Sequence, residues 1–239
     1  MESTLASFVP FVVIFEGRSG STFLVESLDS HPLILALREE FARIHTRVKD
    51  GKIPIEAQVR WLQEFWDKPR AGVNAVGFKT KHRDILDPDT FARVLKERNA
   101  RIIQLARANR IKLVVSLLNG IHLHSETGDW NRYEGGHADP VEVPLDEFDH
   151  WLEKVDKRKD NCARYVRSLE LPTLELVYED LLAQPHAVYE RVLQFLDVPQ
   201  HALEAQTRKN TSDDLREAVL NFDALRARYE GTRYESMFD

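Results

Sequence analysis

The chain has 239 residues, of which 43% are apolar and 30% are charged. Its formal net charge of −6 argues against a general nucleic-acid-binding protein, because such proteins bind by neutralising phosphates with lysine and arginine. No stretch approaches the about 20 apolar residues of a membrane span, and the acidic start MESTLAS is unlike a secretory signal. We therefore expect a cytoplasmic globular protein, and the single cysteine, Cys162, fits a reducing compartment.

Strand-like and helix-like patterns alternate along the chain. The expected strands are residues 9–15, 30–37, 74–80, 100–107 and 171–181. The expected helices are residues 21–29, 49–68, 87–98, 109–124, 145–169 and 186–199, with a polar loop and a last helix in 207–239. This alternation predicts an α/β fold of the three-layer, P-loop-like kind, in which helices flank a mostly parallel central sheet. At this length we expect a single domain over residues 1–239, with ligand sites at the carboxyl ends of the strands.

The loop EGRSGST, residues 16–22, follows the first strand and opens the first helix. Its glycines allow a tight turn and a close approach to a ligand, and the amino end of the helix attracts anions. The lysine of the nucleotide-triphosphate loop G-x-x-x-x-G-K-[ST] is missing. This absence favours a donor with less charge at the transferring group, such as a sulfuryl group, which needs no metal. The candidate donor-binding residues of the loop are Arg18, Ser19, Gly20, Ser21 and Thr22.

A second candidate anion site lies where the strand at 100–107 gives way to the next helix. Arg107 ends the strand, and Ser116 lies further along the helix, so a phosphate near the junction could accept hydrogen bonds from both. Arg110 is a less certain neighbour of that phosphate.

The two segments RSGST (18–22) and LARANRIKLVVS (105–116) together resemble the donor-binding signatures of sulfotransferases. The similarity is greatest to the bacterial carbohydrate and lipopolysaccharide-type enzymes, which carry arginine where cytosolic steroid and phenol enzymes carry lysine. The stretches at 174–199 and 207–225 resemble later parts of the same family, so the likeness covers about residues 11–232.

The resemblance implies the donor 3′-phosphoadenosine-5′-phosphosulfate (PAPS), with product 3′-phosphoadenosine-5′-phosphate (PAP). It implies that residues 18–22 hold the 5′-phosphosulfate and that Arg107 and Ser116 hold the 3′-phosphate. Arg208 and Lys209 resemble residues that close over the donor nucleotide.

The acceptor hydroxyl needs a base, and carbohydrate-type relatives place a glutamate after the first helix and the next short strand. Here LILALREEFARI offers Glu39 and Glu40; we align Glu39, although Arg38 replaces the usual glycine. Lys79 in GFKTKH could stabilise the leaving oxygen. His82 is the alternative base.

The sequence thus predicts a sulfotransferase that acts without a metal on a small-molecule or glycan acceptor. We expect a sugar or glycolipid hydroxyl rather than a steroid or phenol. The histidines at 122, 124 and 137 are joined by no cluster with metal-ligand spacing. Two alternatives stay open: a small-molecule kinase using ATP and Mg²⁺, and a non-catalytic nucleotide-binding protein of the same fold. A homodimer also stays open.

Overall fold

The structure, a computed structural model, describes residues 8–46, 55–68, 70–128, 139–205, 212 and 214–238. Within these ranges the chain forms a five-stranded sheet in the order β2-β3-β1-β4-β5, with every neighbouring pair parallel. The strands are β1 (Val9–Phe15), β2 (Ile34–Leu37), β3 (Ala75–Lys81), β4 (Arg101–Ala106) and β5 (Thr173–Val177). The expectation of an α/β fold with a mostly parallel central sheet is confirmed.

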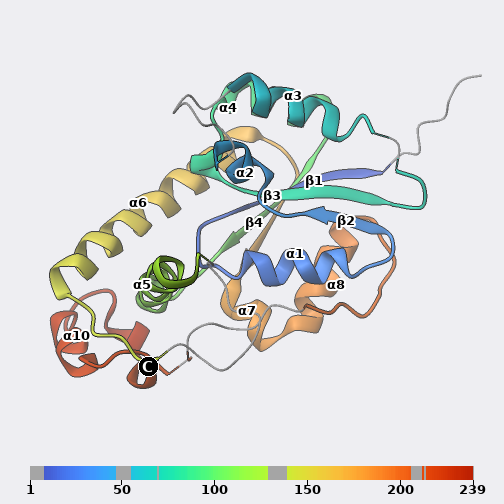
Figure 1. Ribbon diagram of the computed structural model, residues 1–239. Helices are drawn as coiled ribbons and strands as arrows, with labels where there is room; N and C mark the ends of the chain where they lie inside the picture. Colours follow the sequence, from blue (N-terminus) through green and yellow to red (C-terminus); the bar gives the residue numbers. More distant parts are fainter. Residues whose placement is uncertain are drawn as a thin grey trace, which may run out of the picture.

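Helices cover both faces of the sheet (Figure 1). On one side lie α1 (Ser21–Asp29), α7 (Tyr178–Ala183) and α8 (Pro185–Phe195). On the other side lie α2 (Glu40–Thr46), α3 (Ile55–Phe65), η1 (His82–Asp84), α4 (Pro88–Glu97) and part of α6 (Leu145–Leu169). The remaining elements are α5 (Arg110–Thr127), α9 (Leu215–Ala218), α10 (Phe222–Arg228) and η2 (Glu235–Phe238).

The central strand β1 explains how one sheet serves two cores. Its side chains from Phe11 to Ile14 are fully buried, and successive residues face opposite sides. Phe11 and Val13 pack with α1 and α8, whereas Val12 and Ile14 pack with α3, α4 and α6. A third apolar cluster joins α5, the first half of α6 and the C-terminal helices beyond the sheet.

Several expected boundaries differ from those of the structure. The expected strand at 171–181 ends at Val177, and Tyr178 begins α7 instead. The expected strand at 30–37 begins only at Ile34, because His31 forms a turn in which its Nδ1 atom accepts from the Leu33 amide over 3.0 Å. The last helix is divided into α9, α10 and η2, and α2 was not expected. The helix expected at 145–169 is α6, with the same bounds.

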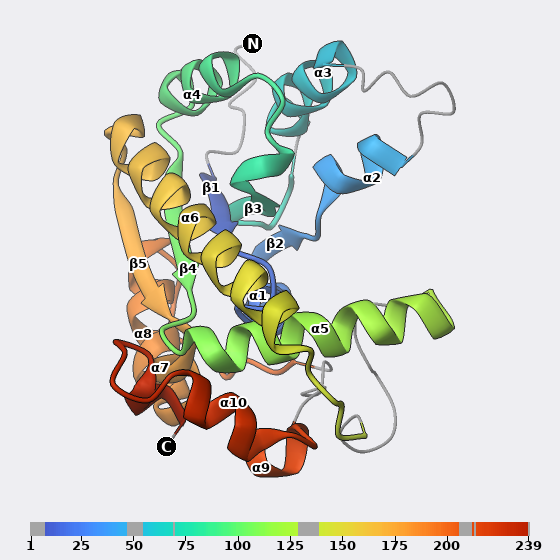
Figure 2. The ribbon, with the colours of Figure 1, turned by 90° about the vertical axis from the view of Figure 1, so that its left-hand side faces the viewer.

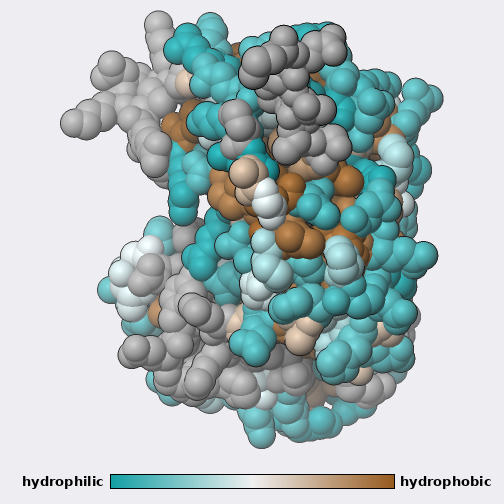
Figure 3. Space-filling view, turned by 90° about the vertical axis from the view of Figure 1, so that its right-hand side faces the viewer, coloured by the Kyte–Doolittle hydropathy of each residue, from teal (hydrophilic) through white to brown (hydrophobic). Residues whose placement is uncertain are grey.

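The carboxyl edge of the sheet opens between two helices. In Figure 2, α2 and α5 extend from this edge, one above the other, on the right-hand side of the view. Figure 3 shows a notch in the molecular surface at the corresponding place, at its left-hand edge. No helix among the described residues is long and apolar enough to cross a membrane.

Candidate active site

The loop between β1 and α1 turns through two residues with left-handed backbone. Gly20, which precedes α1, has φ = 78°, and Arg18 has φ = 66°. A Cβ atom built on Gly20 would lie 2.3 Å from two ring carbons of Tyr178. Ser19 is fully buried, and its hydroxyl donates to the carbonyl oxygen of Glu16 over 2.6 Å. The loop is therefore shaped by its own residues and by the first residue of α7.

Gly20→Ala is expected to destabilise the protein more than Gly128→Ala, although both glycines have nearly the same left-handed φ, 78° and 79°. Each alanine carries the left-handed backbone cost of about 1–2 kcal/mol. A Cβ at Gly128 has no neighbour within 4 Å, whereas at Gly20 the ring of Tyr178 must move. We expect the free energy of unfolding in urea to fall by about 1–3 kcal/mol more for Gly20→Ala. Equal losses of unfolding free energy in the two variants would show that the Tyr178 ring moves aside without an energetic cost.

Lys79, near the end of β3, places a buried ammonium group at this loop. Its Nζ atom donates to the Thr22 hydroxyl over 2.8 Å and to the Ser21 hydroxyl over 3.3 Å. The parallel pairing of β3 with β1 brings it there, with Lys79 opposite Val13. The lysine that the loop sequence lacks is therefore supplied in space by the neighbouring strand.

Glu39, between β2 and α2, is the acidic partner of Lys79. Its Oε1 atom is 3.3 Å from Lys79 Nζ, and its Oε2 atom accepts a hydrogen bond from Lys81. Burial by itself would raise the pKa of Glu39, but the two lysines outweigh burial and hold the pKa below its ordinary value. The carboxylate is thus ionised at neutral pH. Its side chain is still 28% exposed, so a hydroxyl group could reach it.

The ammonium group of Lys79 titrates close to neutrality. Burial lowers its pKa to about 8; Glu39 opposes this shift, and the positive charge of Lys81 adds to it. Lys79 is therefore a cation below about pH 8 and neutral above it.

The other two candidates for the base contact different partners. Glu40 is the first residue of α2, and its carboxylate pairs with Arg43 one turn along the helix at 2.5 Å. The ring of His82 stacks on Tyr165 of α6, with centroids 4.5 Å apart, and burial lowers its pKa. Of the three candidate bases, Glu39 is the one that the described contacts place next to Lys79.

Two arginines, the buried Arg107 and the partly buried Arg18, meet on the other side of the loop. Arg18 Nε donates to Ser116 Oγ over 3.1 Å, and a Cβ atom at Gly120 would lie 3.4 Å from Arg18 Cζ. Arg107 Nη1 donates to the carbonyl oxygen of Arg18 over 3.4 Å. Burial, and next to it the charge of Arg107, lowers the pKa of Arg18 to about 10. An anion placed here would relieve the repulsion between the two guanidinium groups.

The sequence separated these residues into two subsites, with Arg18 at one phosphate and Arg107 and Ser116 at the other. The structure brings all three together, because Arg18 points toward α5. The two anion sites are therefore neighbours that share Arg18.

Glu179 and Tyr178 hold Arg107 in place. Arg107 Cζ lies 4.9 Å from the centroid of the Tyr178 ring, and Arg107 Nε is 3.8 Å from Glu179 Oε1. The Glu179 carboxylate also accepts from the amides of Ala108 (2.9 Å) and Asn109 (3.0 Å), where α5 begins. That carboxylate occupies the amino end of α5. A phosphate at this site would therefore be bound by side chains and not by these amides.

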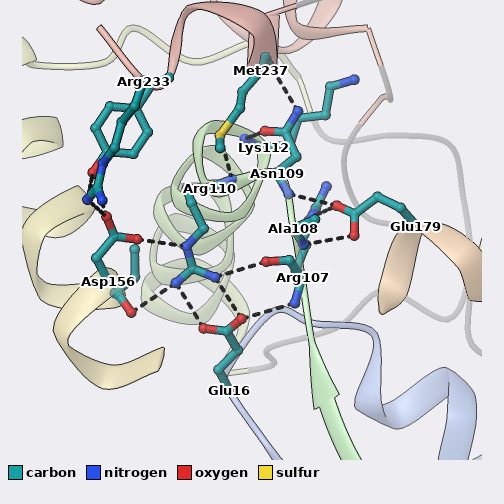
Figure 4. A network of polar contacts seen from close by, with 12 residues as sticks. Glu16, Arg107, Ala108, Asn109, Arg110, Lys112, Asp156, Glu179, Arg233 and Met237 are labelled. Carbon is teal, nitrogen blue, oxygen red and sulfur yellow. Dashed lines mark hydrogen bonds and ion pairs between the residues drawn. The ribbon is translucent and has the colours of Figure 1, made fainter. Parts of the chain in front are cut away.

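Arg110 does not serve as the phosphate contact that the sequence suggested. Its Nη1 and Nη2 atoms donate to Glu16 Oε1 (2.7 Å) and Oε2 (2.9 Å), and its Nε atom donates to Asp156 Oδ1 (3.0 Å) (Figure 4). The remaining two N–H groups reach the carbonyl oxygens of Arg107 and Val155. All five donors of the guanidinium are used within the protein, so we leave Arg110 out of the donor site.

Arg208 and Lys209, expected to close over the nucleotide, lie outside the described residues. Sequence reasoning assigned no role to Glu16, Lys81, Tyr178 or Glu179. A signal existed for Lys81, which is two positions after Lys79 and so faces the same side of β3. The pair Tyr178-Glu179 lies within a stretch that carried the family resemblance.

A cavity of about 420 Å³ lies apart from this site, between α6 and the C-terminal segment. It is lined by the acidic residues Asp149, Glu153, Asp156 and Asp160, together with five others. Two of those five are the cations Lys157 and Arg233, which pair with Glu153 and Asp156, so the lining as a whole stays acidic and we do not place an anionic donor there. In the part of the chain that the structure describes, no group of three or more histidine, cysteine or acidic residues could hold a metal ion.

The parallel sheet, the loop at its carboxyl edge and the neighbouring arginines define an α/β protein with a candidate anion-binding site. Residues 12–230 match the family model of the sulfotransferase domain, and the chain belongs to this family. Both the family resemblance and the assignment as a sulfotransferase enzyme are confirmed.

Relatives of similar length support this assignment. Nodulation protein H of Rhizobium tropici is 26% identical over 100% of this chain and 96% of that protein. Nodulation protein H of Rhizobium meliloti is 24% identical over 96% of this chain and 95% of that protein.

Two solved structures share the fold. A sulfotransferase from Alicyclobacillus acidocaldarius has a TM-score of 0.51 and 17% identity, over 98% of this chain and 96% of that chain. The sulfotransferase domain from the curacin biosynthetic pathway has a TM-score of 0.52 and 16% identity, over 82% of this chain and 76% of that chain.

Proposed function

We propose that this sulfotransferase moves a sulfuryl group from PAPS to a hydroxyl group of a carbohydrate or glycolipid in the cytoplasm. The observation that carries the choice of donor is the pair Arg18 and Arg107 beside Ser116, next to a loop whose hydroxyls contact Lys79. A donor with two anionic groups fits these two neighbouring sites.

The residues present match the chemistry of such a donor. Arg18, Arg107 and Ser116 offer charged and neutral donors to a phosphate. Ser21 and the amino end of α1, together with Lys79, suit a phosphosulfate, because the first amides of a helix have no intrahelical acceptors. Arg208 and Lys209 remain our candidates for residues that close over the nucleotide.

When bound, PAPS supplies the sulfuryl group: its bond to the 5′-phosphate oxygen breaks as a bond to the acceptor oxygen forms. Lys79 is the residue that we assign to the oxygen left on the 5′-phosphate, where negative charge develops. Glu39 is the residue that we assign to the acceptor hydroxyl, which it orients and deprotonates. The 3.3 Å contact between the two side chains keeps the base and the cation next to each other.

A carbohydrate-type acceptor is favoured by the nature of the base. Carbohydrate-type relatives use a glutamate after the second strand, and Glu39 lies at that place, between β2 and α2. Cytosolic steroid and phenol enzymes use a histidine, whereas here His82 packs on Tyr165.

Calorimetry with PAP and with ATP plus Mg²⁺ tests the donor. We expect PAP to bind more tightly, and Arg107→Ala and Arg18→Ala each to weaken it by about 10–100-fold, since each removes charged hydrogen bonds to a phosphate. Arg43→Ala is the matched control, because it also removes a guanidinium group, one that pairs with Glu40 on α2. Preference for ATP with Mg²⁺ would refute the proposal and favour a kinase.

A further inference from the structure

Glu16, the residue after β1, contacts both halves of the proposed donor site. Its backbone carbonyl accepts from the Ser19 hydroxyl within the loop over 2.6 Å. Its carboxylate oxygen Oε1 accepts from the backbone amide of Arg107, at the junction of β4 and α5, over 3.0 Å. These two segments are far apart in sequence, so Glu16 connects them directly.

The carboxylate of Glu16 is buried and fixed by a two-pronged ion pair with Arg110 (Figure 4). The Glu16 side chain is 8% exposed and the Arg110 side chain 3%. Such paired hydrogen bonds hold both partners in one geometry. The carboxylate therefore cannot turn away from the Arg107 amide without breaking a buried ion pair.

The ion pair is in turn anchored to the C-terminal segment. Asp156 of α6 accepts from Arg110 Nε over 3.0 Å, and its other oxygen accepts from Arg233 Nη2 (2.6 Å) and Tyr234 Oη (2.5 Å). Figure 4 shows this line of contacts from Glu16 through Arg110 and Asp156 to Arg233. Contacts with the β4–α5 junction and, through Arg110 and Asp156, with α6 and the C-terminal segment thus fix the position of Glu16.

We propose that Glu16 is a positioning residue that ties the phosphate loop to the Arg107 junction, so that both anion sites are in their binding arrangement before the donor arrives. Glu16 acts through Ser19 and Arg107 and does not touch the donor. Preorganised groups bind more tightly, because the cost of ordering them has been met during folding. The benefit to donor binding rests on the proposed function, whereas the tie itself is a property of the ligand-free chain.

Amide hydrogen exchange of the ligand-free protein tests the tie. In Glu16→Gln we expect exchange to accelerate by about tenfold or more at the Arg107 amide, which loses its charged acceptor, and in the loop at 17–22, because the residue whose backbone carbonyl binds Ser19 loses the ion pair that fixes it. The matched control is Asp149→Asn, which removes another α6 carboxylate, one that binds Tyr229 and Arg228. It should accelerate exchange in the C-terminal segment only. Unchanged exchange at both segments in Glu16→Gln would overturn the proposal.

A second variant covers the case in which Glu16→Gln does not fold, since a buried arginine loses its main partner. Glu16→Met with Arg110→Met replaces the whole ion pair by apolar side chains of similar length, a change that buried pairs often tolerate. We expect this double variant to fold and to show the same faster exchange at 107 and 17–22. Wild-type protection in the folded double variant would contradict the tie.

Calorimetry with PAP and with AMP, which lacks the 3′-phosphate, tests the consequence for binding. Glu16→Gln should reduce the ratio of the AMP Kd to the PAP Kd by about tenfold. Because Glu16 acts in part through Arg107, the losses of PAP affinity in Glu16→Gln and Arg107→Ala should be less than additive in the double variant. Additive losses would refute the positioning role. A wild type that does not prefer PAP to AMP would refute the proposed donor, and the exchange measurement would still decide the tie.

Discussion

Glu39→Gln is expected to lower kcat for sulfuryl transfer by about 10²–10⁴-fold, the range for loss of a general base, whereas Glu40→Gln leaves kcat nearly unchanged. The two residues are adjacent in sequence and carry the same group. The structure separates them, because Glu39 contacts Lys79 and Lys81 whereas Glu40 pairs with Arg43. Steady-state rates at saturating PAPS and acceptor measure the difference.

Donor binding distinguishes loss of the base from damage to the site. Glutamine at position 39 removes the charge that raises the pKa of Lys79, so donor binding is measured at a pH well below 8, where Lys79 is protonated and keeps its contacts with the loop hydroxyls. We therefore expect the Kd for PAP to stay close to that of the wild type, or to decrease. An unchanged kcat in Glu39→Gln, or a kcat lost in Glu40→Gln alone, would show that the base is assigned to the wrong carboxylate.

The sequence predicted where the site lies because it depends on backbone topology. Strands alternating with helices require parallel pairing, and parallel strands end at one edge. The loop after β1, Lys79 on β3 and Arg107 after β4 therefore had to converge, since β3 and β4 both pair with β1. Their place at one edge of the sheet was predicted from local patterns, whereas the strand order that makes them neighbours is seen only in the structure.

The directions of the charged side chains could not be predicted in the same way. Arg107 and Arg110 have the same chemistry and lie three residues apart, yet one faces Arg18 and the other is fully engaged by Glu16 and Asp156. That difference depends on the packing of α6 against α5, which brings Asp156 to the junction. Nothing in the local pattern around Arg110 indicates a partner 46 residues away.

The predicted boundary between β5 and α7 was wrong for a related reason. In the segment at 171–181 the aromatic Tyr178 follows Val177 directly and by itself favours continuation of the strand, whereas Glu179 and Asp180 after it do not. Tyr178 instead begins α7, which places its ring against Gly20 and its neighbour Glu179 at the start of α5. Long-range contacts with the donor loops thus decide a boundary that local propensity assigns differently.

Lys79→Met is expected to lower kcat by about 10²–10³-fold, because it removes the cation next to the oxygen where negative charge develops. The variant keeps the length of the side chain but donates nothing to Ser21 or Thr22. Arg83→Met is a matched control, since this cation follows the same strand but is exposed and pairs with Asp84. A kcat of Lys79→Met close to that of the wild type would exclude a role for this lysine in the transition state.

The same pair of residues sets the pH dependence of kcat/KM, which reports the free enzyme. The proposed mechanism requires Glu39 deprotonated and Lys79 protonated. It should therefore rise with pH through the depressed pKa of Glu39 and fall as pH passes about 8, the pKa of Lys79.

Lys81→Met is expected to shift both the acidic and the alkaline limb of the kcat/KM profile to higher pH. Without Lys81, Glu39 loses a stabilising cation and its pKa rises, while Lys79 loses a repelling neighbour and its pKa also rises.

In Lys79→Met the alkaline limb near pH 8 should vanish. If that limb persists, the group that titrates near pH 8 is another residue, and Lys79 does not act as the protonated partner of Glu39.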